Sequence, residues 1–231
     1  MRAILVAALA AALLSPCTLA GTVIVEWNFN QGSTDPSVGG GQLAQLGGIS
    51  WTLVAGSPSN SGGLGTNQAL NTAAYAAQGV GSGQSGVLIS ASTAGFEQVT
   101  VSWEHRSSNT GSRFMQLEYS TDGIAFTSEG LAEKGLLEIA NGDAWTPRAF
   151  DLSGIAAVAH NPRFSLRITA VFAPGTMAYV AARPGSTYSP SGTQRLDVIR
   201  ISGVAVPSPG GAALMAFAAT LSGSSRRRQH C

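Results

Sequence analysis

The sequence predicts an all-β protein, an antiparallel β-sandwich of the jelly-roll type. Glycine accounts for 29 of the 231 residues and charged residues for only 11%, a composition typical of turn-rich β proteins. Short runs that alternate between apolar and polar residues follow one another, with turn residues between them. Long helical patterns do not alternate with these runs, and no repeat of fixed period occurs, so an α/β or solenoid fold is not expected.

The clearest strands lie within residues 96–123. Apolar side chains of one parity occur in two runs there: Val99, Val101 and Trp103, then Met115, Leu117 and Tyr119. A polar loop over 106–112 separates the runs, and Asp122-Gly123 forms a turn that leads to a return arm over 124–127. We therefore expect an antiparallel meander with one solvent-facing side.

The remaining strands follow from the same alternation. We expect about nine to eleven short strands in all, the others lying at 22–30, 49–54, 68–78 (with a short helix as the alternative), 87–90, 145–152, 164–172 and 195–202. Pro147 places its strand at the edge of a sheet, since proline lacks the N–H that a central strand needs. The glycine-rich segment 31–48 is predicted to be a loop.

Residues 1–20 have the pattern of a secretory signal peptide. Arg2 is followed by an apolar run over 3–14 and by Thr18-Leu19-Ala20, a small-x-small site before Gly21. The alternative is a transmembrane anchor, but the run is shorter than the ~20 residues a spanning helix needs. We therefore expect export, with cleavage by signal peptidase, and a sandwich domain over 21–203.

The segment 204–231 forms a three-part tail. A proline motif comes first (Val206, Pro207, Ser208, Pro209, Gly210), then uncharged residues to Ser225, then Arg226, Arg227 and Arg228. As a helix at ~1.5 Å per residue, the uncharged part would be about 24 Å long, slightly less than a ~30 Å bilayer core. The arginines would remain on the cytoplasmic side.

This tail resembles the PEP-CTERM sorting signal, in which Pro-Glu-Pro precedes a hydrophobic helix and an arginine-rich end; here Ser208 stands in the place of Glu. The resemblance covers 206–228 and implies processing by an exosortase, a membrane-embedded enzyme. The alternative is a permanent single-pass anchor. Either way the helix would hold the protein in the inner membrane, transiently or permanently, with the body outside.

The order of strands and turns in the body is similar to jelly-roll modules of bacterial exported proteins, some of them related to galactose-binding-like and laminin-G-like sandwiches. The runs that carry the similarity are FMQLEYSTDG, WTPRAFDLSGI, NPRFSLRITAVF and RLDVIRISG. This similarity implies the fold and no particular activity.

Charge argues against a nucleic-acid partner. The chain has 13 basic and 12 acidic residues, but Arg2 and the three tail arginines lie outside the body, which leaves a net charge of −3. A mildly acidic body with scattered basic residues lacks the positive surface that nucleic acid requires.

Motifs for catalysis are absent from the sequence. The body has two histidines, His105 and His160, and no cysteine, so neither a histidine–cysteine metal site nor a disulfide is expected. No nucleophile elbow, phosphate loop or dinucleotide fingerprint occurs. A hydrolase with paired carboxylates is the least favoured alternative, with Glu97, Glu104 and Glu118 as candidates.

Two groups of residues are candidate binding sites. Glu26 and Asp197 lie in the first and last strands, which are neighbours in many jelly rolls, and their carboxylates could hold a structural calcium there. Asp197 shares the parity of Ile199 and Ile201, so we expect it to point inward and to need a partner; a hydrogen bond or an ion pair with an arginine such as Arg195 or Arg200 is the alternative to calcium. The second group, Arg106, Tyr179, Arg183 and Tyr188, lies in the two longest excursions and is a candidate glycan or peptide site, with a solvated loop as the alternative.

The sequence thus predicts a non-catalytic exported protein at the cell surface or in the extracellular matrix, with a structural or adhesive role and surface polysaccharide as its candidate partner. The alternative is a carbohydrate-binding module. No cofactor other than the candidate calcium is expected.

Overall fold

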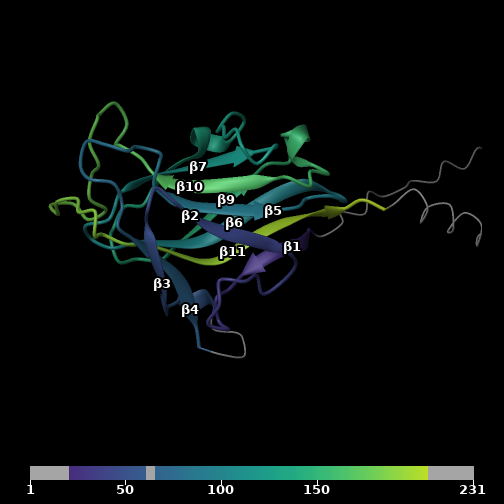
Figure 1. Ribbon diagram of the computed structural model, residues 1–231, viewed down its shortest axis with the longest axis horizontal. Helices are drawn as coiled ribbons and strands as arrows, with labels where there is room; N and C mark the ends of the chain where they lie inside the picture. The colour runs from purple at the N-terminus through teal and green to yellow at the C-terminus, as the bar shows by residue number, and fades with distance from the viewer. Residues whose placement is uncertain (1–20, 61–65, 208–231) are drawn as a thin grey trace, which may run out of the picture.

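The computed structural model describes residues 21–60 and 66–207, and this part of the chain is a sandwich of two antiparallel β-sheets (Figure 1). The predicted all-β sandwich is confirmed. Its strands are β1 Thr22–Trp27, β2 Gly41–Leu46, β3 Ser50–Ala55, β4 Gln68–Ala73, β5 Gly86–Ala91, β6 Phe96–Ser107, β7 Phe114–Ser120, β8 Leu136–Glu138, β9 Thr146–Asp151, β10 Ser165–Ala170 and β11 Gln194–Ala205. Three single turns of 3₁₀-helix lie between them: η1 Pro58–Asn60, η2 Ala132–Gly135 and η3 Ala156–Val158.

One sheet, here called sheet A, has the strand order β3-β4-β11-β6-β9, and β1 pairs with the second half of β11. The other, sheet B, has the order β2-β5-β10-β7-β8. Eight of the strands form nested pairs, β4 with β11, β5 with β10, β6 with β9 and β7 with β8. The chain therefore doubles back on itself and passes from one sheet to the other along its length.

The core lies between the sheets and is filled by the apolar parity of each strand. Sheet A contributes Val25, Trp27, Val99, Val101, Trp103 and Ile201, and sheet B contributes Val87, Ile89, Leu117, Leu166 and Ile168, each at most 2% exposed. Alternation along a strand sends every second side chain to the other face. The polar parities therefore form two outer faces, one on each sheet.

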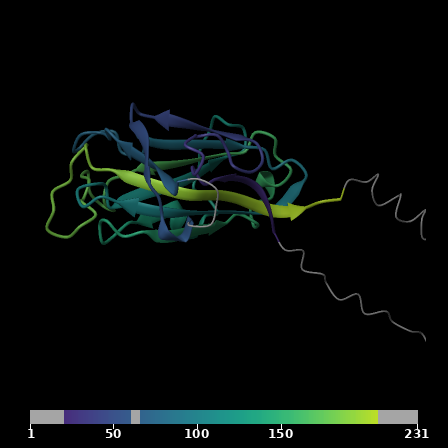
Figure 2. The same ribbon diagram turned by 90° about the horizontal axis from the view of Figure 1, so that it is seen from below.

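The long strand β11 runs the length of the sandwich, and the two described ends of the body lie at the same end of it (Figures 1 and 2). Thr22 is opposite Gly203, and Val206 donates its N–H to the carbonyl of Gly95 at 2.8 Å. The excursion between β10 and β11 lies at the opposite end. The first and last strands are neighbours, as predicted, and Pro147 lies in the edge strand β9, also as predicted.

The predicted meander is wrong, because β6 and β7 belong to different sheets. Strand β6 pairs with β11 and β9, whereas β7 pairs with β10 and β8. Alternation specifies that one face of each strand is buried, not which strand lies beside it, and here the two apolar faces meet across the core. Of the predicted return arm only Thr127 bridges to Tyr119. Strand β2 lies in the segment predicted to be a loop.

The predicted signal peptide and most of the predicted sorting motif (Ser208, Pro209, Gly210, Arg226, Arg227 and Arg228) lie outside the described residues, whereas Val206 and Pro207 directly follow β11. Within the two described ranges, no helix has the length and the apolar character needed to cross a membrane.

Candidate functional site

The outer face of sheet B carries three cross-strand rows of side chains. The pairing registers of β2, β5, β10 and β7 align Gln42, Ser90, Ser165 and Ser120 in a first row, Ala44, Leu88, Arg167 and Glu118 in a second, and Leu46, Gly86, Thr169 and Gln116 in a third. The first row is entirely polar. In it the hydroxyl of Ser165, a residue that is only 4% exposed, donates to the hydroxyl of the more exposed Ser90 at 3.1 Å.

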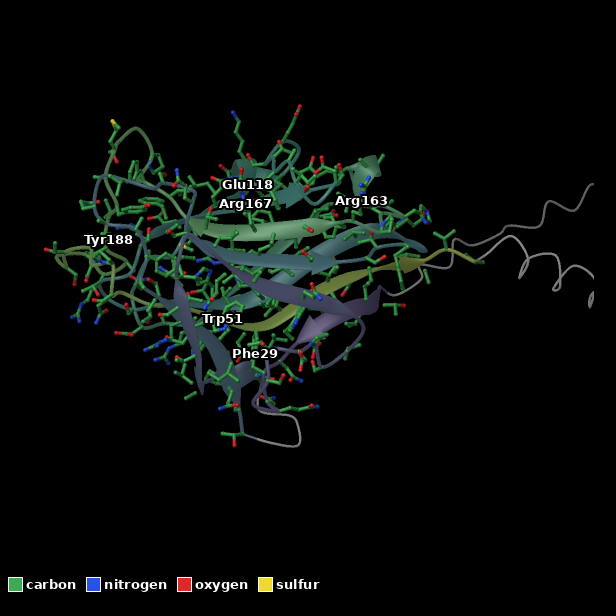
Figure 3. The ribbon with its side chains drawn as sticks, in the orientation of Figure 1. Phe29, Trp51, Glu118, Arg163, Arg167 and Tyr188 are labelled. Carbon is green, nitrogen blue, oxygen red and sulfur yellow. The ribbon has the colours of Figure 1, made fainter. Side chains whose placement is uncertain are left out.

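A pocket of about 450 Å³ lies over the first row. Gln42, Ser90 and Ser165 line it together with residues of four segments at this end of the sandwich: Gly40, Gly41, Ala91, Ser92, Asp122, Gly123, Pro162, Arg163 and Phe164. Gly41 has to be glycine, because a Cβ there would lie 2.7 Å from the ring of the buried Trp27. The pocket is at the end of the sandwich that Arg163 marks in Figure 3.

Asp122 presents a fixed carboxylate to this pocket. Its Oδ1 accepts the backbone N–H groups of Ile124 and Ala125 and the hydroxyl of Ser120, each at 2.8 Å. These bonds, the two backbone donors first, lower the pKa of Asp122 to about 2, because they stabilise the charged form. Among the described residues no donor bonds to Oδ2, so this oxygen can accept a hydrogen bond from a ligand.

The second row supplies an ordered charge pair and an aromatic ring. Arg167 donates from Nε to the carboxylate of Glu118 at 2.7 Å, and its guanidinium carbon lies 4.7 Å from the centroid of the Phe126 ring. Both side chains of the pair are partly exposed, 29% for Arg167 and 17% for Glu118. Figure 3 shows the two beside each other on sheet B. The ion pair and the cation–π contact hold Arg167 in one orientation on the face.

This arrangement suits a ligand rich in hydroxyl groups. Gln42 and the two serines can each donate and accept hydrogen bonds, the Asp122 carboxylate accepts, and Arg163 donates. Leu88 and Phe126 add apolar surface beside the polar row, which the C–H faces of a sugar ring can cover. Nothing in the pocket provides a nucleophile activated by a neighbouring base.

The predicted loop site is only partly assembled. Tyr179 and Tyr188 are 2% and 8% exposed and stack on each other at 4.6 Å, so they pack inside the loop end. Their role in binding a ligand stays a prediction. Arg106 ion-pairs with Asp143, and Asp143 and Arg183 line a separate pocket at the loop end.

The two predicted calcium ligands have different partners. Glu26 ion-pairs with Arg200, its cross-strand neighbour, with Nη2 2.6 Å from Oε2. Asp197 is fully buried and accepts N–H groups from Ser57, Asn60 and Val198 at 2.7–2.8 Å. Protein donors therefore occupy both carboxylates, an arginine for Glu26 and N–H groups for Asp197. No group of three or more potential metal-binding side chains occurs in the part of the chain that is described.

The candidate catalytic residues do not converge either. Glu104 and Glu97 are on β6 in sheet A, and Glu118 is on β7 in sheet B, where it belongs to the outer face. Glu104 also points away from the core, as the neighbour of buried Trp103 and His105. Glu104 and Glu118 are therefore on opposite sides of the sandwich and cannot flank one bond.

The sequence reasoning missed the residues of the sheet B pocket. Gln42 lies in a segment taken for a loop, and Ser90 and Ser165 are small polar residues whose alignment depends on strand register. One signal was available: the turn Ser120 to Gly123, whose aspartate binds its own backbone, marks an ordered carboxylate.

No protein-family model and no curated protein matches the sequence. Solved structures do match. The chain is similar to the CBM22-1 xylan-binding domain of Paenibacillus barcinonensis Xyn10C, with 14% identity over 83% of this chain and 100% of that domain, at a TM-score of 0.45. It is also similar to the K1 cleaved adhesin domain of Lys-gingipain from Porphyromonas gingivalis W83, with 12% identity over 76% of this chain and 95% of that domain, at a TM-score of 0.41.

Proposed function

We propose that this protein is a non-catalytic, exported module that binds polysaccharide through the outer face of sheet B. The observation that carries the proposal is the pocket over the row Gln42, Ser90 and Ser165, with Asp122 and Arg163 at its rim. An open pocket whose polar side chains hydrogen-bond the hydroxyl groups of a sugar requires neither a cofactor nor a metal for binding.

We propose further that the sandwich is a jelly roll. The nested pairing of eight strands, β4 with β11 through to β7 with β8, supports this, because two Greek keys folded on one another pair the first strand with the last.

The proposal also covers the localisation of the protein. The apolar leader supports export, and the tail supports sorting by an exosortase to the cell surface or extracellular matrix. Val206 is hydrogen-bonded to the domain and Pro207 follows it directly, so a membrane-held tail would keep the body close to the bilayer. The C-terminal mass of protein recovered from cells and medium tests this: loss of residues beyond 209 is expected, and an intact 226–231 in a membrane fraction would make the tail an anchor.

The binding proposal is tested by affinity electrophoresis in gels that contain xylan, β-glucan or galactan. The wild-type protein should be retarded by at least one of them. Gln42→Ala and Arg163→Ala should each reduce the retardation, whereas Ser102→Ala, on the outer face of sheet A, should leave it unchanged. Mobility that no polysaccharide alters, or retardation that the sheet B substitutions leave intact, would refute the proposal.

A further inference from the structure

Two arginines lie opposite each other on the outer face of sheet A, at the loop end. Arg195 of β11 and Arg106 of β6 are cross-strand partners. Arg106 is held by Asp143, whose carbonyl and carboxylate both accept from its guanidinium, the carbonyl at 3.0 Å. Arg195 donates from Nε to the Asn71 side chain at 3.1 Å, which leaves its terminal nitrogens without a carboxylate among the described residues.

The repulsion between these two arginines lowers the stability of sheet A. Like charges directly opposite each other on a sheet destabilise it, and within residues 21–60 and 66–207 Asp143 is the one carboxylate that pairs with either arginine. Burial lowers the pKa of Arg195, the charge of Arg106 lowers it further, and Asp143 partly offsets both effects. Two arginines and one aspartate give this corner a net positive charge, although the body as a whole is acidic.

Asp143 also forms part of a pocket of about 480 Å³, whose lining is Asn109, Asn141, Gly142, Asp143, Arg183 and Pro184. The walls are fixed. The N–H of Asp143 donates to the Ser107 carbonyl at 2.6 Å, and the N–H of Arg183 donates to the Asn109 carbonyl at 3.1 Å. Gly142 packs so closely on Asn109 that a Cβ would lie 2.7 Å from its Cα. The pocket thus combines two side-chain amides with a third arginine.

We infer that this corner, defined by Arg106, Arg183, Arg195 and the amides of Asn109 and Asn141, binds the carboxylate of an acidic sugar. Guanidinium groups match a carboxylate in charge and geometry, and the amides can bond the hydroxyls of the same ring. The ligand class is a uronate-bearing polysaccharide. The inference rests on the proposed function only in taking the ligand to be a polysaccharide.

The corner and the sheet B pocket are at opposite ends of the sandwich (Figure 3). Arg163 marks the end with the pocket and the described chain ends, and Tyr188 marks the loop end. A long chain could therefore be bound at two separate places. The loop end is opposite the end at which the described chain stops with Pro207 (Figure 1), so the corner would remain accessible on a protein held at a surface through its C-terminal segment.

Isothermal titration of the full-length mature protein with trigalacturonate tests the inference, with neutral galactotriose and a short single-stranded DNA as comparison ligands. We expect trigalacturonate to bind, and more weakly in 200 mM than in 50 mM salt, since salt screens exposed charges. Arg183→Gln and Arg195→Gln should each weaken binding about tenfold, the factor for ~1.4 kcal/mol. Arg200→Gln, an arginine of the same outer face that is already paired with Glu26, is the matched control and should bind as the wild type does.

Each result has a defined meaning. Equal affinity for trigalacturonate and galactotriose, or for trigalacturonate and DNA, would overturn the inference, as would wild-type binding by the Arg183→Gln, Arg195→Gln double variant. If that variant binds neutral polysaccharide normally but no longer binds trigalacturonate, the corner is a separate site for acidic sugars. If Gln42→Ala abolishes neutral binding while trigalacturonate still binds, the two sites are independent. Trigalacturonate binding that persists when no neutral polymer binds supports the corner and refutes the sheet B pocket.

Discussion

The buried carboxylate of Asp197 accepts the backbone N–H of Ser57 at 2.7 Å, which joins the last strand to a loop 140 residues earlier in the chain. Asn60 and Val198 donate to the other oxygen. Burial nevertheless outweighs these donors and raises the pKa of Asp197 to about 6. The group therefore links the stability of the fold to pH.

The first prediction concerns this link. Because the pKa of Asp197 is higher in the folded than in the unfolded state (~3.9), the folded state holds the proton more tightly. Its contribution to the free energy of unfolding is complete below about pH 4 and is lost as the pH rises through about 6, roughly 3 kcal/mol in all at ~1.4 kcal/mol per pKa unit. Urea unfolding of wild type and Asp197→Asn from pH 4 to 8 should show their difference shrinking over that range.

The control for this measurement is Asp151→Asn. Bonds from the Ser153 side chain and backbone lower the pKa of exposed Asp151, so its contribution is complete above its unfolded pKa of ~3.9 and should stay nearly constant over this range. A wild-type-minus-Asp197→Asn difference that is constant from pH 4 to 8 would contradict the assignment.

The second prediction concerns His105, which is fully buried. The Trp103 indole can only donate, so its 3.2 Å bond makes Nδ1 of His105 the acceptor, and Nε2 carries the proton that is donated to Gln194 at 3.0 Å. Burial is the largest cause that lowers the pKa of His105, to about 3. The stability that its neutral form provides is complete above about pH 6.5 and is lost as the pH falls towards 3.

The ring-proton chemical shift of His105, followed by NMR, should thus stay constant from pH 8 to 5, with free histidine in the same sample as the reference. A titration midpoint of His105 near that of free histidine would show that the ring is hydrated and that the hydrogen bonds linking Trp103, His105 and Gln194 are not formed.

Local pattern predicted the strands well and their partners poorly. The alternation of Val99, Val101 and Trp103 requires one buried face, and that face is buried. Which strand lies beside β6 depends on contacts with residues about 90 positions later in β11, which alternation along one strand does not encode. Proline was more informative, because the missing N–H of Pro147 excludes a central strand and thereby fixes an edge.

The candidate sites show the same limit. Tyr179 and Tyr188 have the composition of a binding loop, yet their rings meet each other in the interior. Gln42, Ser90 and Ser165 are unremarkable along the chain, and strand register alone brings them into one row. Asp197 was expected to point inward and to need a partner. It does point inward, and its partners include N–H groups of Ser57 and Asn60, in a loop that no local sequence pattern connects to Asp197.

The third prediction concerns the Arg167–Glu118 pair. Because both side chains are partly exposed, water screens the attraction, and a double-mutant cycle with Arg167→Ala and Glu118→Ala should give a coupling of about 0.5–1 kcal/mol in urea unfolding. Arg167→Ala should also weaken polysaccharide binding, since the second row then loses its ordered donor. A cycle on Arg113 and Glu138, an exposed pair away from the pocket, should show similar coupling with no effect on binding. Equal binding by Arg167→Ala and wild type would remove Arg167 from the site.

The fourth prediction separates structural tyrosines from binding ones. The Tyr188 hydroxyl donates to the Ala76 carbonyl at 2.7 Å, and its ring stacks on Tyr179, which meets Phe172 edge-on at 4.8 Å. Tyr188→Phe keeps the ring and leaves the carbonyl without its donor, so the free energy of unfolding should fall by about 1 kcal/mol. Tyr188→Ala also opens a cavity and should cost about 3–5 kcal/mol, as for other large aromatic side chains. Tyr188→Phe should bind xylan and trigalacturonate as the wild type does, because the hydroxyl points into the fold; weaker binding at unchanged stability would instead place Tyr188 in a ligand site.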